Sequence, residues 1–211
     1  MKLLVLLPWP DWLALFALFG LWSGYALFAS RLSQRKRSLL ATTNQYRSRW
    51  MMQASYRDPR MLDGLITQSL SQTPSFFSST SILIIGGLLA VMGTTDKAVE
   101  LVKDMPFAQV TTAEVVEFKL VVLVAIFVYT FFRFSWCMRQ YTFVSLVIGA
   151  MPSPEDFASG KVDREAYVQR AAAQVGAAAE TVNDGRRAYD FSFAALAWFF
   201  SPLALVLATL V

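Results

Sequence analysis

The sequence predicts an all-α polytopic membrane protein with four transmembrane helices, two of them extended into the cytoplasm. Of the 211 residues, 55% are hydrophobic and 16% are charged, and the mean hydropathy is +0.44. A soluble domain usually has about 25% charged residues. Apolar runs of about 20 residues, enough to cross a bilayer, recur at 11–30, 75–93, 119–139 and 191–211. We therefore expect residues 1–211 to form a single integral membrane domain.

The residue types that metal and redox chemistry need are scarce. The chain has no histidine, which is the usual haem and zinc ligand and the default general base. Its one cysteine, Cys137, cannot form an internal disulfide. No nucleotide-binding loop, nucleophile elbow or zinc-binding motif occurs, and no nucleic-acid fold signature accompanies the basic residues. We therefore expect no catalytic residues, no cofactor, no metal site and no nucleic-acid partner, so the chain is not expected to be an enzyme.

The first apolar run has two interpretations. Lys2 and the apolar residues that follow it are typical of a cleaved signal peptide. However, no A-x-A cleavage site follows the run. Three tryptophans are also unusual in a cleavable segment: Trp9, Trp12 and Trp22. We expect residues 11–30 to be a retained transmembrane helix.

The charges of the connecting segments predict the topology. Residues 31–73 hold eight Lys or Arg and two Asp, whereas residues 94–118 hold two Lys and five acidic residues. Basic residues near span ends favour the cytoplasmic side. The first connection is therefore expected in the cytoplasm and the second outside. Four spans then place both termini outside and residues 140–190 in the cytoplasm.

The basic connection is expected to be helical. No Pro or Gly occurs from 26 to 56, so the first helix can continue to about Arg57, where Asp58-Pro59 stops it. Apolar side chains recur on one helical face at Leu32, Leu39, Tyr46 and Trp50. A short amphipathic helix over 61–70 follows. This connection is either a partner surface or platform on anionic lipid, or an ordinary cytoplasmic loop that is helical.

The second span is predicted to start at Thr73-Pro74, because a hydroxyl cap with Pro in the first turn is a helix start signal. Its cytoplasmic end is rich in hydroxyl groups. Gly86, Gly87 and Ala90 have the spacing that lets helices pack closely. These residues serve either packing within the chain or a dimerisation face.

The third span belongs to a longer predicted helix. Thr111 and Glu114 have capping-box spacing, and no Pro or Gly interrupts residues 112–148. Such a helix is about 55 Å long, which exceeds the hydrocarbon core, so it should project into the cytoplasm. A short outer helix over 96–105 is expected before it, and the prolines of 151–154 end it.

The C-terminal part combines an alanine-rich helix with the fourth span. Ala166–Ala179 is a strong helix former with a thin side-chain layer that allows close approach to a neighbour. Gly185 permits a turn or a close backbone contact. Phe191–Val211 is the expected fourth span, with a kink at Pro202.

Two arginines inside the third apolar run need a physical reason, because charge is costly in a bilayer. Arg139 lies at the expected cytoplasmic end and can snorkel to the headgroups. Arg133 is deeper and needs a partner. The candidates are Trp136, by a cation–π contact, or a carboxylate or carbonyl on another helix, and Asp190 is the nearest acid by depth.

A second group of polar residues spans 183–190, between the alanine-rich helix and the fourth span. Its arginines, with Arg133 and Arg139, would place up to four guanidinium groups at one depth. They could bind a phosphate headgroup, conduct an anion, or be ordinary interfacial charge. The candidate helix-clamp or anion and lipid-headgroup site comprises Arg133, Trp136, Arg139, Gln140, Asn183, Arg187, Tyr189 and Asp190.

These motifs are similar to those of a known family. Phe134-Ser135-Trp136 with Arg139-Gln140, and the run from Asn183 to Phe199, resemble two signatures of the bacterial and plant membrane proteins called domain of unknown function five-nine-nine. Arg49-Trp50-Met51 and 79–83 resemble its earlier blocks. Asp190 departs from the apolar or aromatic residue expected there. The resemblance implies a membrane topology and no activity, and we expect the bacterial inner membrane as the location.

The leading functional hypothesis is a non-catalytic membrane protein, either a self-associating scaffold or an accessory subunit of a larger complex. Anionic lipid headgroups at the cytoplasmic face are expected partners, with other copies of the chain or subunits of a membrane complex. The alternative is an oligomeric anion channel or carrier that uses Arg133, Arg139 and Arg187. A third hypothesis, an enzyme acting on lipid, lacks an identifiable nucleophile.

Overall fold

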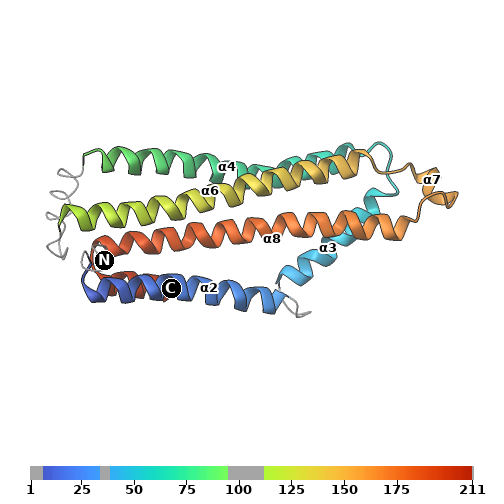
Figure 1. Ribbon diagram of the computed structural model, residues 1–211. Coiled ribbons are helices and arrows are strands. Elements are labelled where there is room, and N and C mark those ends of the chain that lie inside the picture. The colour runs from blue at the N-terminus through green and yellow to red at the C-terminus, as the bar shows by residue number, and fades with distance from the viewer. Residues whose placement is uncertain (1–6, 34–38, 95–111, 211) are drawn as a thin grey trace. The chain divides into compact units, whose positions relative to one another are not determined.

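The computed structural model describes residues 7–33, 39–94 and 112–210, which form helices and loops without a strand in these ranges (Figure 1). The all-α class is therefore confirmed. Three helices are long and apolar enough to cross a membrane, at Trp9–Ala29, Met61–Met92 and Ala113–Gly149, which indicates a membrane protein. The helices are α2 (Trp9–Ser33), α3 (Leu39–Ala54), α4 (Met61–Met92), α6 (Ala113–Gly149), α7 (Pro154–Ala158), α8 (Arg164–Leu196), the 3-10 helix η1 (Ala197–Phe199) and α9 (Pro202–Leu210).

The described residues divide into two compact units. Unit 1 draws on residues 1–27, 79–132 and 185–211, and unit 2 on residues 28–78 and 133–184. Helices α4, α6 and α8 each contribute one part to each unit. That residues 1–211 form a single integral membrane domain stays a prediction.

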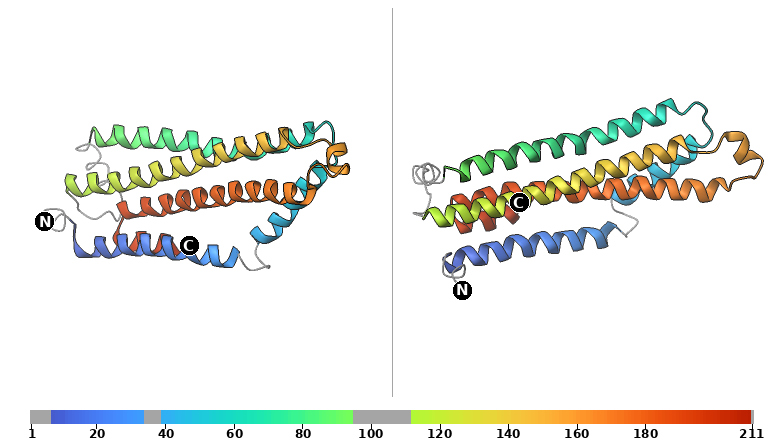
Figure 2. Two further views of the ribbon diagram at one scale, coloured as in Figure 1. Left: turned by 45° about the vertical axis from the view of Figure 1, so that its right-hand side comes forward. Right: turned by 45° about the horizontal axis from the view of Figure 1, so that its top comes forward.

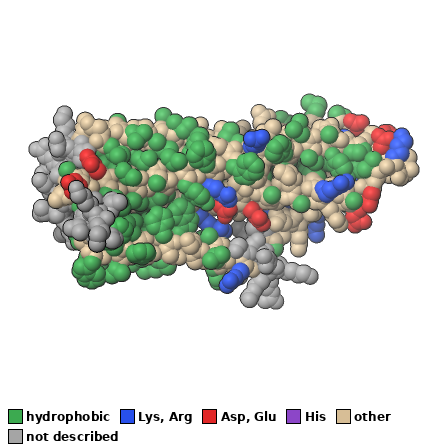
Figure 3. Space-filling view, viewed as in Figure 1, with side chains coloured by type: hydrophobic (Ala, Val, Ile, Leu, Met, Phe, Trp, Pro, Cys, Tyr) green, Lys and Arg blue, Asp and Glu red, His purple; other side chains and the backbone are tan. Residues whose placement is uncertain are grey.

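Unit 1 contains most of the apolar sequence. Its buried core includes Leu18 of α2, Phe127 of α6, Trp198 of η1 and Leu205 of α9. Hydrophobic side chains also predominate on the face of α2 and of the unit 1 parts of α4 and α6 that Figure 3 shows. A helix that is apolar on both its buried and its exposed side is typical of a membrane environment.

In unit 2, α6 lies between α4 and α8 (Figures 1 and 2). Its core joins Met51 of α3, Val144 of α6 and Val175 of α8, all almost fully buried. The alanines of α8 provide the thin layer that the sequence predicts: Ala171, Ala172, Ala178 and Ala179 are buried. The side chain of Asn44 comes within 3.5 Å of where a Cβ on Gly176 would lie, so α3 and α8 approach closely there.

The long third helix is confirmed, since α6 runs from Ala113 to Gly149 against the predicted 112–148. The predicted break at Thr73-Pro74 is wrong, because α4 continues through Pro74 without interruption. Proline removes one backbone N–H, which a long helix with intact turns on both sides tolerates. The expected short helix over 61–70 is thus the first part of α4.

The fourth span differs from the prediction. Helix α8 continues through Gly185, where a turn was possible, and ends at Leu196. After η1, Pro202 begins a separate helix, α9, instead of kinking a single one. Helix α9 runs back along the end of α8 (Figure 2), and its nine residues span about 14 Å, which is too short to cross a bilayer. A single span over 191–211 that is kinked at Pro202 is therefore wrong.

The remaining expectations concern the course of the first helix beyond residue 33, the outer helix and the glycines of α4. Residues 34–38, through which the first helix was expected to continue, and 96–105, the expected outer helix, lie outside the described residues. Helical structure resumes at Leu39 and ends at Ala54, before Asp58-Pro59. Gly86 and Gly87 are exposed, and no atom of the described residues lies within 4 Å of an added Cβ, so packing among these residues does not account for them.

Candidate functional site

The predicted clamp at Arg133 exists, but with a different acid. Arg133 of α6 forms an ion pair with Asp184 of α8, and both side chains are partly exposed. Asp190 as its partner is wrong. Six residues rotate a helix by about 600°, so Asp190 and Asp184 leave α8 in different directions. Trp136 is 48% exposed and makes no cation–π contact with Arg133, so that alternative is also wrong.

Two further contacts continue this seam between α6 and α8 in unit 2. The Thr181 hydroxyl donates a 3.2 Å hydrogen bond to Oε1 of Gln140, and both residues are buried. The Cys137 thiol donates to the carbonyl of Ala178 at 3.4 Å. Residues 133, 137 and 140 of α6 therefore face α8, as the spacing i, i+4, i+7 predicts for one side of a helix. The polar seam fixes the register of the two helices.

The other predicted residues are distributed over both units. Arg139 is exposed and lies over the Phe143 ring at 5.9 Å, and Asn183 is half-buried in α8. Arg187 and Tyr189 belong to unit 1. The Arg187 guanidinium lies 5.4 Å from the centre of the Tyr25 ring, and Tyr189 packs edge-on against Phe127 at 5.7 Å. The grouping of four guanidinium groups at one depth stays a prediction.

A buried charged cluster in unit 1 was missed. The Lys119 ammonium donates to the backbone carbonyl of Trp198 at 2.8 Å and lies 3.6 Å from Asp11 Oδ1. The Trp198 indole donates to the same carboxylate oxygen at 2.6 Å. Asp11 and Lys119 are 4% and 8% exposed, so both charges are sequestered from solvent. The cluster joins the first turn of α2 and the second turn of α6 to η1.

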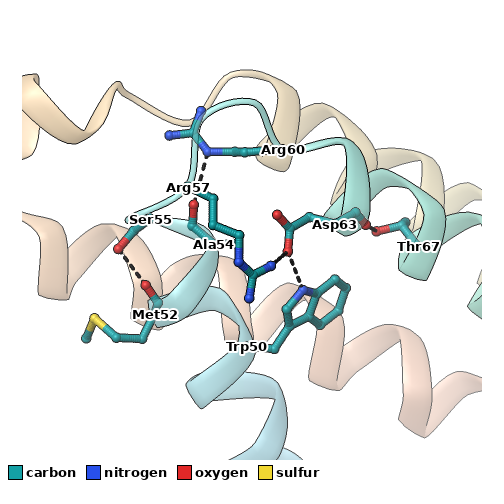
Figure 4. Close-up of polar contacts among 8 residues, drawn as sticks. All are labelled: Trp50, Met52, Ala54, Ser55, Arg57, Arg60, Asp63 and Thr67. Carbon is teal, nitrogen blue, oxygen red and sulfur yellow. Dashed lines mark hydrogen bonds and ion pairs between the residues drawn. The ribbon is translucent and has the colours of Figure 1, made fainter.

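A second missed cluster, in unit 2, surrounds Asp63 (Figure 4). Asp63 is fully buried, and its Oδ1 accepts from Arg57 at 2.5 Å and from the Trp50 indole at 2.8 Å. Its Oδ2 has no partner among the described residues. The carboxylate therefore connects the start of α4 to the end of α3 and the turn that follows.

Arg60, in the same turn, satisfies three backbone carbonyls. Its Nε donates to Ala54 at 3.1 Å, and its two terminal nitrogens donate to Met151 at 2.9 Å and Pro152 at 2.6 Å. The planar guanidinium presents donors in several fixed directions, which suits such a role. Arg60 thus connects the α3–α4 turn to the loop after α6.

The end of α6 is also joined to α8. The Tyr167 hydroxyl donates to the carbonyl of Val147 at 2.7 Å. Burial raises the pKa of Tyr167, while the positive charges of Arg60 and Arg170 oppose that shift. The phenol therefore stays protonated and keeps donating throughout the neutral pH range.

The profile of one protein family, described as protein of unknown function, DUF599, matches residues 13–211. The chain belongs to the DUF599 family. This confirms the family that the sequence motifs indicated. No curated protein and no solved structure matches the chain.

In this DUF599 chain, the motifs that indicated the family lie at helix contacts. Phe134 is fully buried and stacks on Phe77 at 5.1 Å, and the Ser135 and Ser78 hydroxyls are hydrogen-bonded at 3.2 Å. Trp198, near the end of the second motif, is the indole that binds Asp11. The only signal that could have revealed the Asp11 cluster was a charge at the first residue of two predicted spans, 11–30 and 119–139.

Proposed function

We propose that this chain is a non-catalytic membrane protein of the bacterial inner membrane, acting as a self-associating scaffold or as an accessory subunit of a larger membrane complex. The observation that carries the proposal is that charges within its apolar helices pair with each other. Lys119 lies beside Asp11, and Arg133 pairs with Asp184. A catalytic or transport site needs such groups turned toward a substrate. Here they join helices instead.

The same pairing weighs against the anion-channel alternative. A carboxylate next to Arg133 neutralises the charge that would attract an anion. The deepest arginine of the proposed conduction path is therefore engaged in a helix contact. No contact among the described residues specifically favours conduction over a structural role.

Self-association is supported by one face of α4. Gly86, Gly87 and Ala90 are exposed there, next to the exposed Leu83. Small residues let two helix backbones approach closely in a bilayer, where dispersion contacts between close-packed helices drive association. We propose that this face binds a second copy of the chain or a subunit of the complex.

Substitution of a glycine on this face tests the proposal. Gly87→Leu should reduce the oligomeric fraction at least severalfold, because its side chain would hold the partner helix away. Gly20→Leu is the matched control, since Gly20 is an exposed glycine of α2 with equally open surroundings. The measurement is subunit counting by single-molecule photobleaching after reconstitution in nanodiscs. A strictly monomeric wild type, with no co-purifying subunit in mild detergent, would contradict the proposal.

For the topology, we propose three membrane crossings, by α2, α4 and α6, and an end of α8 that extends to the outer level, where Trp198 of η1 binds Asp11, before α9 folds back. The basic connection 31–73 lies in the cytoplasm, where it can approach anionic headgroups, and residue 9 lies outside. Because α9 folds back along α8 from the outer level over only about 14 Å, its end lies within the bilayer. This replaces the expectation that the C-terminal residues lie outside.

A further inference from the structure

A cavity in unit 1 lies among α2, α8 and α9. Its volume is about 420 Å³, within the range of roughly 300–1,000 Å³ that is common for ligand sites. Its lining is mainly apolar, with two charged side chains from α8. The lining residues are Leu21, Tyr25, Arg187, Asp190, Phe191, Ala194, Ala208, Thr209 and Leu210.

The two charges of the cavity, Arg187 and Asp190, have opposite sign and lie close together. They are three residues apart on α8, a spacing that brings Cβ atoms within about 5–6 Å of each other on one side of a helix. Arg187 is half-buried over the Tyr25 ring, which favours one position of the guanidinium. Asp190 is exposed. The cavity therefore combines a cation and an anion with an apolar wall.

We propose that this cavity binds a diacyl phospholipid whose headgroup carries both a phosphate and a primary ammonium group, that is, a phosphatidylethanolamine. Arg187 would donate to the phosphate, and the Asp190 carboxylate would accept from the ammonium. One acyl chain would lie against Leu21, Phe191 and Ala208. The site lies in unit 1, which holds part of each of the three helices long enough to cross a membrane.

The charge pair selects this headgroup over the other common ones. Phosphatidylglycerol has no ammonium, so Arg187 would pair with its phosphate and Asp190 would gain no cationic partner from the lipid. Phosphatidylcholine has a quaternary ammonium without N–H donors, so it cannot form the hydrogen bond that Asp190 offers. This site is separate from the basic connection 31–73, which suits anionic lipid, and it does not depend on the proposed oligomer.

Native mass spectrometry of the full chain in mild detergent tests the proposal. Phosphatidylethanolamine, phosphatidylcholine and phosphatidylglycerol with identical acyl chains are titrated separately. We expect one phosphatidylethanolamine to be retained about tenfold more tightly than either of the others, as one additional charge-assisted hydrogen bond predicts. Free phosphoethanolamine in excess should not displace it, since it cannot fill the apolar part of the cavity.

Variants then assign the contacts. Arg187→Gln should weaken all three lipids about tenfold, whereas Asp190→Asn should remove the preference for phosphatidylethanolamine over both other lipids. Ala208→Phe should abolish retention by filling the apolar part of the cavity. Arg186→Gln is the matched control, because Arg186 is an exposed arginine on the next position of α8 that does not line the cavity.

Three results would overturn the proposal. One is equal retention of phosphatidylethanolamine and phosphatidylcholine by the wild type. Another is the same loss in Arg186→Gln as in Arg187→Gln, which would indicate unspecific attraction. The third is an unchanged preference in Asp190→Asn. Since Asp190 is exposed, this last variant keeps the test decisive even if Arg187→Gln disturbs folding.

Discussion

The Trp198 indole donates a 2.6 Å hydrogen bond to Oδ1 of Asp11, although 187 residues separate the two in the sequence. The same oxygen lies 3.6 Å from the Lys119 ammonium. One carboxylate thereby connects the beginning of α2, the beginning of α6 and η1. A buried carboxylate of this kind is stable only because both neighbours supply donors, and removal of one partner leaves an uncompensated charge.

We predict that Asp11→Leu destabilises the protein by about 3–5 kcal/mol, since it leaves the Lys119 ammonium buried without its acid. Asp11→Asn should cost less, because an amide oxygen still accepts from the Trp198 indole. The measurement is the unfolding midpoint in mixed detergent micelles, followed by tryptophan fluorescence.

The double variant Asp11→Leu with Lys119→Met supplies the control. Removal of both charges should recover most of the stability that Asp11→Leu loses. If the double variant is as unstable as the sum of the two single variants, the two side chains do not interact energetically, and the predicted coupling is wrong.

The ion pair between Arg133 and Asp184 should contribute much less. Both side chains are partly exposed, at 29% and 40%, and such pairs contribute about 0–1 kcal/mol. Arg133→Gln is therefore expected to lower stability by no more than about 1 kcal/mol, and Arg133→Asp with Asp184→Arg should restore it. Arg139→Gln, at an exposed arginine without an ion pair among the described residues, should have no measurable effect. A loss of several kcal/mol on Arg133→Gln would contradict this assignment.

Local patterns predicted much of the helical structure. The absence of Pro and Gly over 112–148 set the limits of α6 to within one residue, because no competing turn signal interrupts that stretch. The alanine-rich segment was correctly expected to pack closely. Both features depend on neighbouring residues alone, which the sequence displays directly.

The contacts between distant segments could not be predicted in the same way. Choosing Asp190 over Asp184 as the partner of Arg133 assumed that membrane depth decides the pair, whereas the rotation of α8 decides it. The fold-back of α9 depends on how η1 and Pro202 pack against unit 1, and a single proline in a sequence equally predicts a kink. Asp11 was missed because a charge at the end of an apolar run is ordinarily at the membrane surface.

Arg60 offers a test of unit 2. We predict that Arg60→Met lowers stability by about 2–3 kcal/mol, because three carbonyls lose a charged donor. Arg60→Lys should recover only part of this loss, since an ammonium cannot reach the same three directions. The loop 151–163 should also become more sensitive to limited proteolysis.

Arg170→Met is the matched control for Arg60. Arg170 is an exposed arginine of unit 2 whose one hydrogen bond to the described residues goes to the carbonyl of Ala166, within its own helical turn. Its replacement should change neither the unfolding midpoint nor the cleavage rate of the loop. Equal effects of the two substitutions would show that the carbonyl contacts of Arg60 contribute nothing specific.

The fold-back of α9 makes a prediction about sidedness. In a Cys137→Ala background, single cysteines at three exposed positions can be labelled with a membrane-impermeant maleimide: Trp9, Ser159 and Leu210. Trp9→Cys should react only from outside in intact cells. Ser159→Cys should react only after the membrane is opened, and Leu210→Cys should not react from outside, because α9 folds back along α8 into the bilayer.

The labelling of Leu210→Cys separates two topologies that the apolar sequence alone leaves equivalent. A helix of nine residues reaches about 14 Å, roughly half of the hydrocarbon core, so α9, which starts beside the outer ends of α2 and α6, leaves residue 210 within the bilayer. Labelling of Leu210→Cys from outside, together with protection of Ser159→Cys, would place the end of α9 at the outer surface. It would refute the fold-back of α9 and, with it, the cavity that α9 closes against Arg187 and Asp190.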